Sequence, residues 1–239
     1  MRPHKEWKVL PHDPLVEIED GILTVTGDIP MPLAHLKRRM TIVRLQDKRL
    51  IVYSAIALDE SEMARIESYG RPAFLVVPSD IHRLDARIWK DRYPAMQVVA
   101  PQGAREKVEK VVPVDTTSPD FGDPNVKFVT VAGVEGHEAA LVVKTPRGTT
   151  LVVNDLVGNI HDAHGPGGWI LKKAGFAGDK PQVPRVVKKK IVEDERALGA
   201  QLEEWAKIDS LSRIIVSHGE TIESNPRGTL RDLARSLQA

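Results

Sequence analysis

The chain has 239 residues, with 34 basic and 33 acidic side chains, a formal net charge of +1 and no cysteine. The near-neutral charge gives no general attraction to nucleic acid or to an anionic membrane surface, and the lack of cysteine excludes disulfides, thiolate metal ligands and a cysteine nucleophile. Hydrophobic residues form 41% of the sequence, but no apolar run reaches the roughly 20 residues of a membrane span, and the N-terminus lacks the apolar stretch of a signal peptide. We therefore expect one globular, cytoplasmic domain over residues 1–239.

The first half of the sequence predicts two β-hairpins followed by alternating helices and strands. Two pairs of short apolar runs, each joined by a turn dipeptide, predict hairpins over 16–29 and 40–53. Residues 59–69 have acids early, apolar residues at helical spacing and a glycine after the end, which is typical of a capped amphipathic helix. The wholly apolar run FLVV at 74–77 predicts a strand buried on both faces. The elements expected next are a helix at 86–93, a strand at 97–100 and a helix at 104–111.

The second half repeats this order of strands and helices. Strands are expected at 126–131, 139–145, 149–153 and 213–216, and helices at 196–208 and 229–237. Residues 161–184 are rich in glycine and proline, and the segment is long enough to form a surface excursion or lid. Two similar halves predict two sheets that pack face to face, with helices on the outside.

Four polar residues share one placement, at the ends of predicted buried strands. They are His82, His137, Asp155 and His218. Polar groups at the ends of several buried strands converge on one rim of a sheet, which is where folds of this type build their sites. Imidazole and carboxylate are also the ligands that zinc, iron or manganese accept in a protein without thiols.

The segment PSDIHRLDARIWKDRYPAMQVVAP resembles the first metal motif of the metallo-β-lactamase superfamily, T-H-x-H-x-D-H followed by a helix and a strand. The resemblance puts Asp80, His82 and Asp85 at positions of metal-ligating histidines. Leu84 stands where the superfamily has an aspartate. Only His82 is identical to the motif at these ligand positions.

Two further segments extend the resemblance over roughly residues 40–237. GVEGHEAALVVKTPRGTTLVVND resembles the part that carries the next histidine and the bridging aspartate, and IIVSHGETI resembles the last His-Gly, which implies His137, Asp155 and His218 as ligands. The expected fold is a four-layer αββα sandwich of two mixed sheets with helices outside. Residues 39–94 and the segment TLVVNDLVGNI are similar to a narrower group, the uncharacterised bacterial DUF4336 family.

The resemblance implies a metal-dependent hydrolase acting on a small ester, thioester, lactone or phosphoester. One ion would be held by His82, His137 and Asp155, with Asp80 as a further ligand, and a second by Asp85, Asp155 and His218. A three-ligand site with an open position suits hydrolysis because it acidifies bound water. A leucine cannot ligate, so Leu84 argues against two-zinc catalysis. The sequence allows one divalent ion (Zn, Mn or Fe) or none, and it identifies no catalytic residue.

A non-catalytic relic of the fold, acting as a binding or interaction module, is the alternative. Asp80 and Asp85 would then cap the helix that begins near Ala86. His161 and His164 are equally explained as residues of a solvated loop. The basic run of Arg185 and 188–190 is followed by acids, which indicates a solvated helix start rather than a nucleic-acid patch. The expected partners are a small-molecule substrate, if the chain is an enzyme, and no nucleic acid or membrane; a homo-oligomer is allowed.

Overall fold

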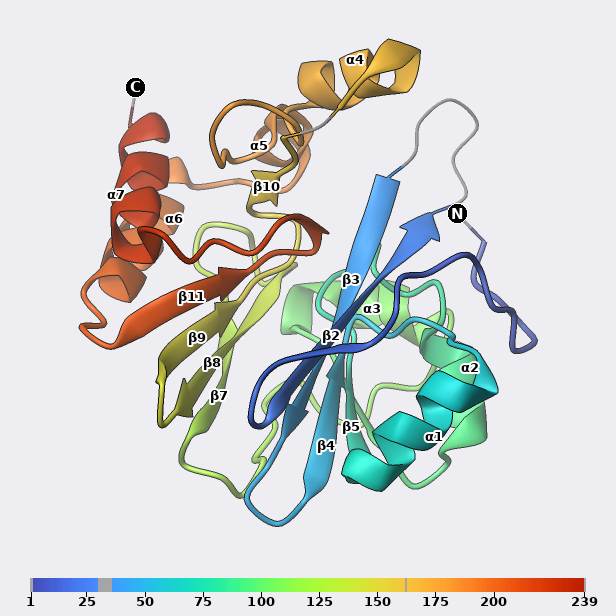
Figure 1. The fold of residues 1–239 in the computed structure, drawn as a ribbon. Coiled ribbons are helices and arrows are strands. Elements are labelled where there is room, and N and C mark those ends of the chain that lie inside the picture. Colours follow the sequence, from blue (N-terminus) through green and yellow to red (C-terminus); the bar gives the residue numbers. More distant parts are fainter. Residues whose placement is uncertain (1, 30–35, 162, 239) are drawn as a thin grey trace.

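The first sheet has six strands in the order β1-β2-β3-β4-β5-β6. Figure 1 shows a computed structural model of the chain, in which residues 2–29, 36–161 and 163–238 are described. The strands are Val16–Glu19 (β1), Ile22–Ile29 (β2), Leu36–Arg44 (β3), Arg49–Tyr53 (β4), Arg71–Val76 (β5) and Gln97–Val99 (β6). The first four pair antiparallel and the last three pair parallel, so the sheet is mixed.

The second sheet has the order β11-β9-β8-β7. Its strands are Val126–Thr130 (β7), Ala139–Thr145 (β8), Gly148–Val152 (β9) and Leu211–Ile215 (β11). The β9–β11 pair is parallel and the other pairs are antiparallel, so this sheet is mixed too. Further along the chain from β9 and β11, the short strands β10 (Gly158–Asn159) and β12 (His218–Gly219) pair in parallel.

Helices cover the outer face of each sheet (Figure 1). On the first sheet these are α1 (Glu60–Tyr69), α2 (Ala86–Arg92) and α3 (Arg105–Glu109), with a 3-10 turn (Gln102–Ala104) before α3. On the second they are α6 (Glu195–Ala206) and α7 (Pro226–Ser236). Helix α5 (Arg185–Lys190) lies beside β10 and adds Val187 to the same apolar cluster. Side-chain caps fix where three of them begin, because Asp59, Asp194 and Asn225 each accept a backbone N–H of the first turn.

Alternation along the strands builds three apolar layers. In β4, Leu50 and Val52 pack under the helices of the first sheet, whereas Ile51 and Tyr53 face the second sheet. In β9, Leu151 packs under the helices of the second sheet and Val152 faces inward. The predicted four-layer arrangement of two mixed sheets with helices outside is therefore confirmed.

The Gly/Pro-rich segment contains more regular structure than its composition predicts. Helix α4 spans Gly165–Ala174, and it ends at Gly175 in the left-handed conformation with a φ of 86°. Leu171 and Ala177 pack with Ile29 and Leu36, at the ends of β2 and β3, so the segment covers one rim of the first sheet. Buried leucine and alanine contacts outweigh the low helix propensity of glycine here.

The basic run of Arg185 and 188–190 was expected at the start of a helix, but its lysines lie at the end of one. Lys188, Lys189 and Lys190 form the last turn of the short helix α5, and the next helix, α6, begins only at Glu195. Lysines at a helix C-terminus interact favourably with the helix dipole, and Lys188 also pairs with Glu195. In the described part of the chain, no helix combines the length and apolar character needed to cross a membrane.

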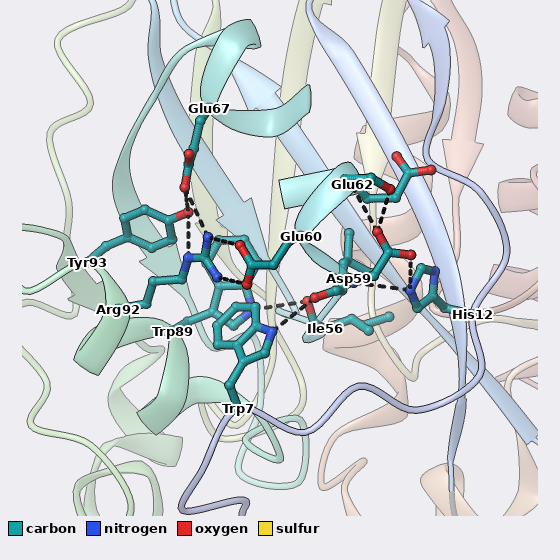
Figure 2. A network of polar contacts seen from close by, with 12 residues as sticks. Trp7, His12, Ile56, Asp59, Glu60, Glu62, Glu67, Trp89, Arg92 and Tyr93 are labelled. Atoms are coloured by element: carbon teal, nitrogen blue, oxygen red, sulfur yellow. Dashed lines mark hydrogen bonds and ion pairs between the residues drawn. The ribbon is translucent and has the colours of Figure 1, made fainter. Parts of the chain in front are cut away.

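Residues 2–13 form an N-terminal strap that runs over α2 and the start of α1. The Trp7 indole donates to the Leu58 carbonyl at 2.9 Å and packs against Trp89, with ring centroids 5.7 Å apart. Figure 2 shows Trp7 beside Trp89. It also shows the Arg92 guanidinium, which lies over the Trp7 ring and pairs with Glu60. At its start, the strap reaches the loop between β5 and α2, where the backbone N–H of His4 donates to Leu84.

Candidate metal centre

Three of the predicted side chains meet at one point. His82 follows β5, Asp155 follows β9, and His218 begins β12. The Nε2 atoms of His82 and His218 lie 3.1 Å and 3.0 Å from the same oxygen, Asp155 Oδ1. One ligand atom from each residue lies within 4.8 Å of the other two, and the three side chains are buried.

The far nitrogen of each imidazole is held by the chain. Nδ1 of His218 lies 2.7 Å from the Lys37 carbonyl oxygen, and Nδ1 of His82 lies 2.9 Å from Ser54 Oγ. A carbonyl oxygen only accepts, so Nδ1 of His218 carries its hydrogen. In a neutral His218, Nε2 then presents its lone pair to Asp155, which is how metal-binding imidazoles are oriented.

The position of His218 at the start of β12 requires a glycine as the next residue. Gly219 has a φ of 105°, and a Cβ at this position would lie 2.0 Å from the Asn159 carbonyl oxygen. Only glycine therefore allows β12 to pair with β10 and present His218 at the end of the sheet.

The electrostatics of the cluster fit either a shared proton or a bound cation. Burial raises the pKa of Asp155, but the neighbouring His82 and His218 outweigh this effect and hold the pKa of that carboxyl well below its ordinary value. The other oxygen, Oδ2, is buried and has no hydrogen-bond partner among the described residues. A neutral His218 lone pair facing a carboxylate oxygen at 3.0 Å is repulsive unless a proton or a metal ion lies between them. Two imidazoles and one carboxylate are donors that fit Zn²⁺, Fe²⁺ or Mn²⁺.

Behind Asp155 lies a second buried carboxyl, Glu138. It is fully buried, and burial together with the Asp155 charge raises its pKa well above the ordinary value. The Asn154 amide donates to it at 3.4 Å and to Ser79 Oγ at 3.2 Å, and Asn154 in turn accepts from Ser217. This network holds the start of the loop that carries Asp155.

His137 and Asp80 lie outside the cluster. Asp80 forms an ion pair with Lys107, and Nδ1 of His137 lies 3.8 Å from the Asp80 carboxylate, with the His137 side chain 30% exposed. A lysine therefore already neutralises Asp80, and the carboxylate does not converge with the other three residues.

Asp85 is also engaged elsewhere. It occupies the position before α2 but forms no side-chain cap there. Its carboxylate pairs with the buried Arg38, lies 2.7 Å from His4 Nδ1 and accepts the Ala57 backbone N–H at 3.0 Å. Of the six residues proposed from the sequence, the structure thus brings together His82, Asp155 and His218.

An apolar cavity of about 160 Å³ adjoins the three residues. Its apolar walls are formed by Ile29, Leu36, Ile81, Leu84 and Phe176, and Arg38 completes the lining. The Phe176 ring packs edge-on against His218 with centroids 5.3 Å apart, so the Gly/Pro-rich segment reaches the site. His161 and His164, which come from that segment, do not line this cavity.

Sequence reasoning missed Ser54, Arg38, Glu138 and Phe176. Ser54 had a usable signal, since it directly follows the buried strand β4 just as Asp155 follows β9. It also adopts a left-handed conformation with a φ of 57°, which turns the chain at the site. The other three carry no spacing pattern, because their roles depend on tertiary contacts.

The fold is similar to that of solved metallo-β-lactamases. FIM-1 from Pseudomonas aeruginosa in its mono-zinc form superposes with a TM-score of 0.62 at 13% identity, covering 96% of this chain and 97% of that one. DIM-1 exposed to ceftazidime gives 0.64 at 12%, with 96% and 99% covered. The enzyme from Erythrobacter litoralis with β-mercaptoethanol in the active site gives 0.64 at 10%, with 93% and 96% covered. The chain therefore has the metallo-β-lactamase fold.

Comparison of the amino-acid sequence with known families and proteins identifies no relative. No protein-family model matches the chain, and no curated protein matches it.

Proposed function

We propose that this chain is a hydrolase that holds one divalent metal ion with His82, Asp155 and His218 and acts on a small ester, thioester, lactone or phosphoester. The observation that carries the proposal is the pair of imidazole Nε2 atoms directed at one oxygen of a buried carboxylate. A bound ion supplies Lewis acidity, which polarises the bond to be cleaved and activates water at neutral pH. We place the chain near the DUF4336 family within the fold, on the similarity of residues 39–94.

The chain's own residues have definite tasks in this proposal. The Lys37 carbonyl and Ser54 fix the orientation of the two imidazoles, and Asp155 supplies the negative charge. The apolar cavity places hydrocarbon walls beside the three residues. Because Arg38 neutralises Asp85 and Leu84 offers no donor, the proposal includes one ion and not two.

Metal content is the direct test. Protein purified without chelator should contain about one ion per chain, and EDTA should lower its melting temperature because a specifically bound ion stabilises the native state. His82→Ala, Asp155→Ala and His218→Ala should each lose the ion. His137→Ala is the matched control, since it removes a histidine outside the cluster, and it should retain the ion.

Two results would contradict the proposal. A metal-free protein whose melting temperature ignores both EDTA and added Zn²⁺, Mn²⁺ or Fe²⁺ would leave the binding or interaction module as the better reading. Loss of the ion in His137→Ala, at unchanged folding, would return His137 to the ligand set.

A further inference from the structure

We infer that the cavity beside the three residues binds a short aliphatic acyl chain, and that the substrate is an ester or thioester of a short fatty acid. This inference rests on the proposed function and narrows its substrate class. It is carried by the size of the cavity and by its apolar walls.

Size limits the ligand first. The cavity measures about 160 Å³, whereas pockets for drug-sized ligands measure about 300–1,000 Å³. An apolar cavity of about 150 Å³ accepts a molecule the size of benzene. The cavity therefore has room for a chain of roughly four to six carbon atoms.

The walls select for an apolar group. Core packing holds Leu36 and Leu84 in place, and the aromatic contact with His218 holds Phe176. Ile81 also lines the cavity, yet it is 59% exposed, so it lies at the mouth. An aliphatic chain that enters past Ile81 buries its surface at a gain of about 25 cal/mol per Å².

Leu84 is the residue that makes this part of the site apolar. It is only 6% exposed and lines the cavity, and its backbone is fixed by the hydrogen bond from the His4 N–H to its carbonyl. The carboxylate of the next residue, Asp85, is bound to Arg38. The place at which a second cation would need ligands is thus a hydrocarbon wall.

Arg38 argues for an acyl group over a phosphoryl group. It lines the cavity at 4% exposure, and its Nε is buried without a partner among the described residues. Its other contacts are donated to the Ala55 carbonyl and to Asp85. Because Asp85 already balances its charge, Arg38 has little net charge left to offset the negative charges of a phosphoryl group in an apolar cavity.

The reaction is a simple hydrolysis. The oxygen of water forms a bond to the acyl carbon, and the bond from that carbon to the ester oxygen or thioester sulfur breaks. The electron pair leaves with the alkoxide or thiolate, which takes up one proton of the water. The products are a short carboxylic acid, released as carboxylate and a proton, and an alcohol or thiol. No other co-reactant is required.

Binding of the carboxylate products tests the inference without an activity assay. Sodium acetate, butanoate, hexanoate, octanoate and decanoate are titrated into the metal-loaded protein by calorimetry. Affinity should rise from acetate to hexanoate and should gain nothing further from octanoate or decanoate, because carbon atoms beyond about the sixth lie outside the cavity.

Two variants of Leu84 locate the binding site. Leu84→Ala enlarges the cavity and should move the preferred chain to a longer acid, whereas Leu84→Phe fills it and should weaken hexanoate binding by about tenfold. Both should keep the ion. If Leu84→Phe fails to fold, the change in preferred chain length in Leu84→Ala is sufficient to test the inference.

Equal affinity for all chain lengths, or a preference that Leu84→Ala does not change, would overturn the inference. Tighter binding of inorganic phosphate than of hexanoate would do the same. In each case, a bound ion lost on His82→Ala would leave the proposed function standing, whereas a protein without the ion would remove the function itself.

Discussion

Two buried clusters of charge meet the loop between β5 and α2, and they differ in the groups that face the carboxylate. The carboxylate of Asp85 receives a guanidinium from Arg38, a backbone N–H from Ala57 and a contact from His4. The carboxylate of Asp155 receives two imidazoles, and one of its oxygens has no partner in the described part of the chain.

The difference teaches what prepares a buried carboxylate for a metal ion. Burying an ionised carboxylate without a partner is too costly for a stable fold. The Asp85 cluster meets this cost with an arginine that is always charged. The Asp155 cluster uses histidines, which offer a positive charge when protonated and a lone pair when neutral. Under the proposed function, the second arrangement would take its cation from solution.

Removing the Asp85 charge should give the largest effect on stability. Asp85→Asn leaves Arg38 buried without a counter-charge, which we expect to cost about 3–5 kcal/mol of unfolding free energy. Thermal and urea unfolding measure it, with Asp91→Asn on the exposed side of α2 as the control. Metal content should not change. A loss below about 1 kcal/mol would show that the two clusters do not differ as described.

Removing the Asp155 charge should act through the ion. At a free ion concentration 100-fold above Kd, the wild-type protein should gain about 2.7 kcal/mol from metal binding. Asp155→Asn should abolish this gain, whereas Asp85→Asn should retain it. The melting temperature with and without Zn²⁺ measures both. An equal gain in wild type and Asp155→Asn would place the ion elsewhere.

Ser54 tests the support of one imidazole. Ser54→Ala removes the partner of His82 Nδ1, and we expect metal affinity to fall by about tenfold, because groups that orient a ligand affect affinity by about 10- to 100-fold. Competition with a chromogenic chelator measures the affinity. Ser61→Ala, at the start of α1, is the control and should bind the ion as wild type does.

Glu138 should give the smallest effect, one that depends on pH. Burial and Asp155 raise the pKa of Glu138 in the native state. The contribution of Glu138 to the free energy of unfolding is therefore fully present below its unfolded-state pKa, and it is lost as pH rises through its native-state pKa. Glu138→Gln removes this loss, so metal-free Glu138→Gln should be more stable than wild type at pH 8 by about 1 kcal/mol. Melting curves of both proteins from about pH 5 to 8 should diverge with rising pH, and parallel curves would contradict the prediction.

Much of the fold and half of the proposed ligand set follow from local sequence pattern. Strand ends pointed to four residues, because strand runs and terminal polar residues are local signals. The structure brings together His82, Asp155 and His218 and leaves His137 outside the cluster. The partners of Asp80 and Asp85 could not be identified this way, since Lys107 and Arg38 lie 27 and 47 positions away. No spacing rule connects such pairs. Helix α4 was missed because its stability comes from packing against β2 and β3 rather than from its glycine-rich sequence.

The N-terminal strap connects the folding of the chain to the Asp85 cluster. His4 precedes its partner Asp85 by 81 positions, so the strap docks only after β5 and α2 are in place. Trp7 packs on the outer surface of α2, and the strap pairs with β2 only through the isolated bridge between His12 and Gly27. We therefore expect it to open before the sheets do, so that the His4 amide, which donates to the Leu84 carbonyl, exchanges with solvent while the amides of β3 and β9 stay protected.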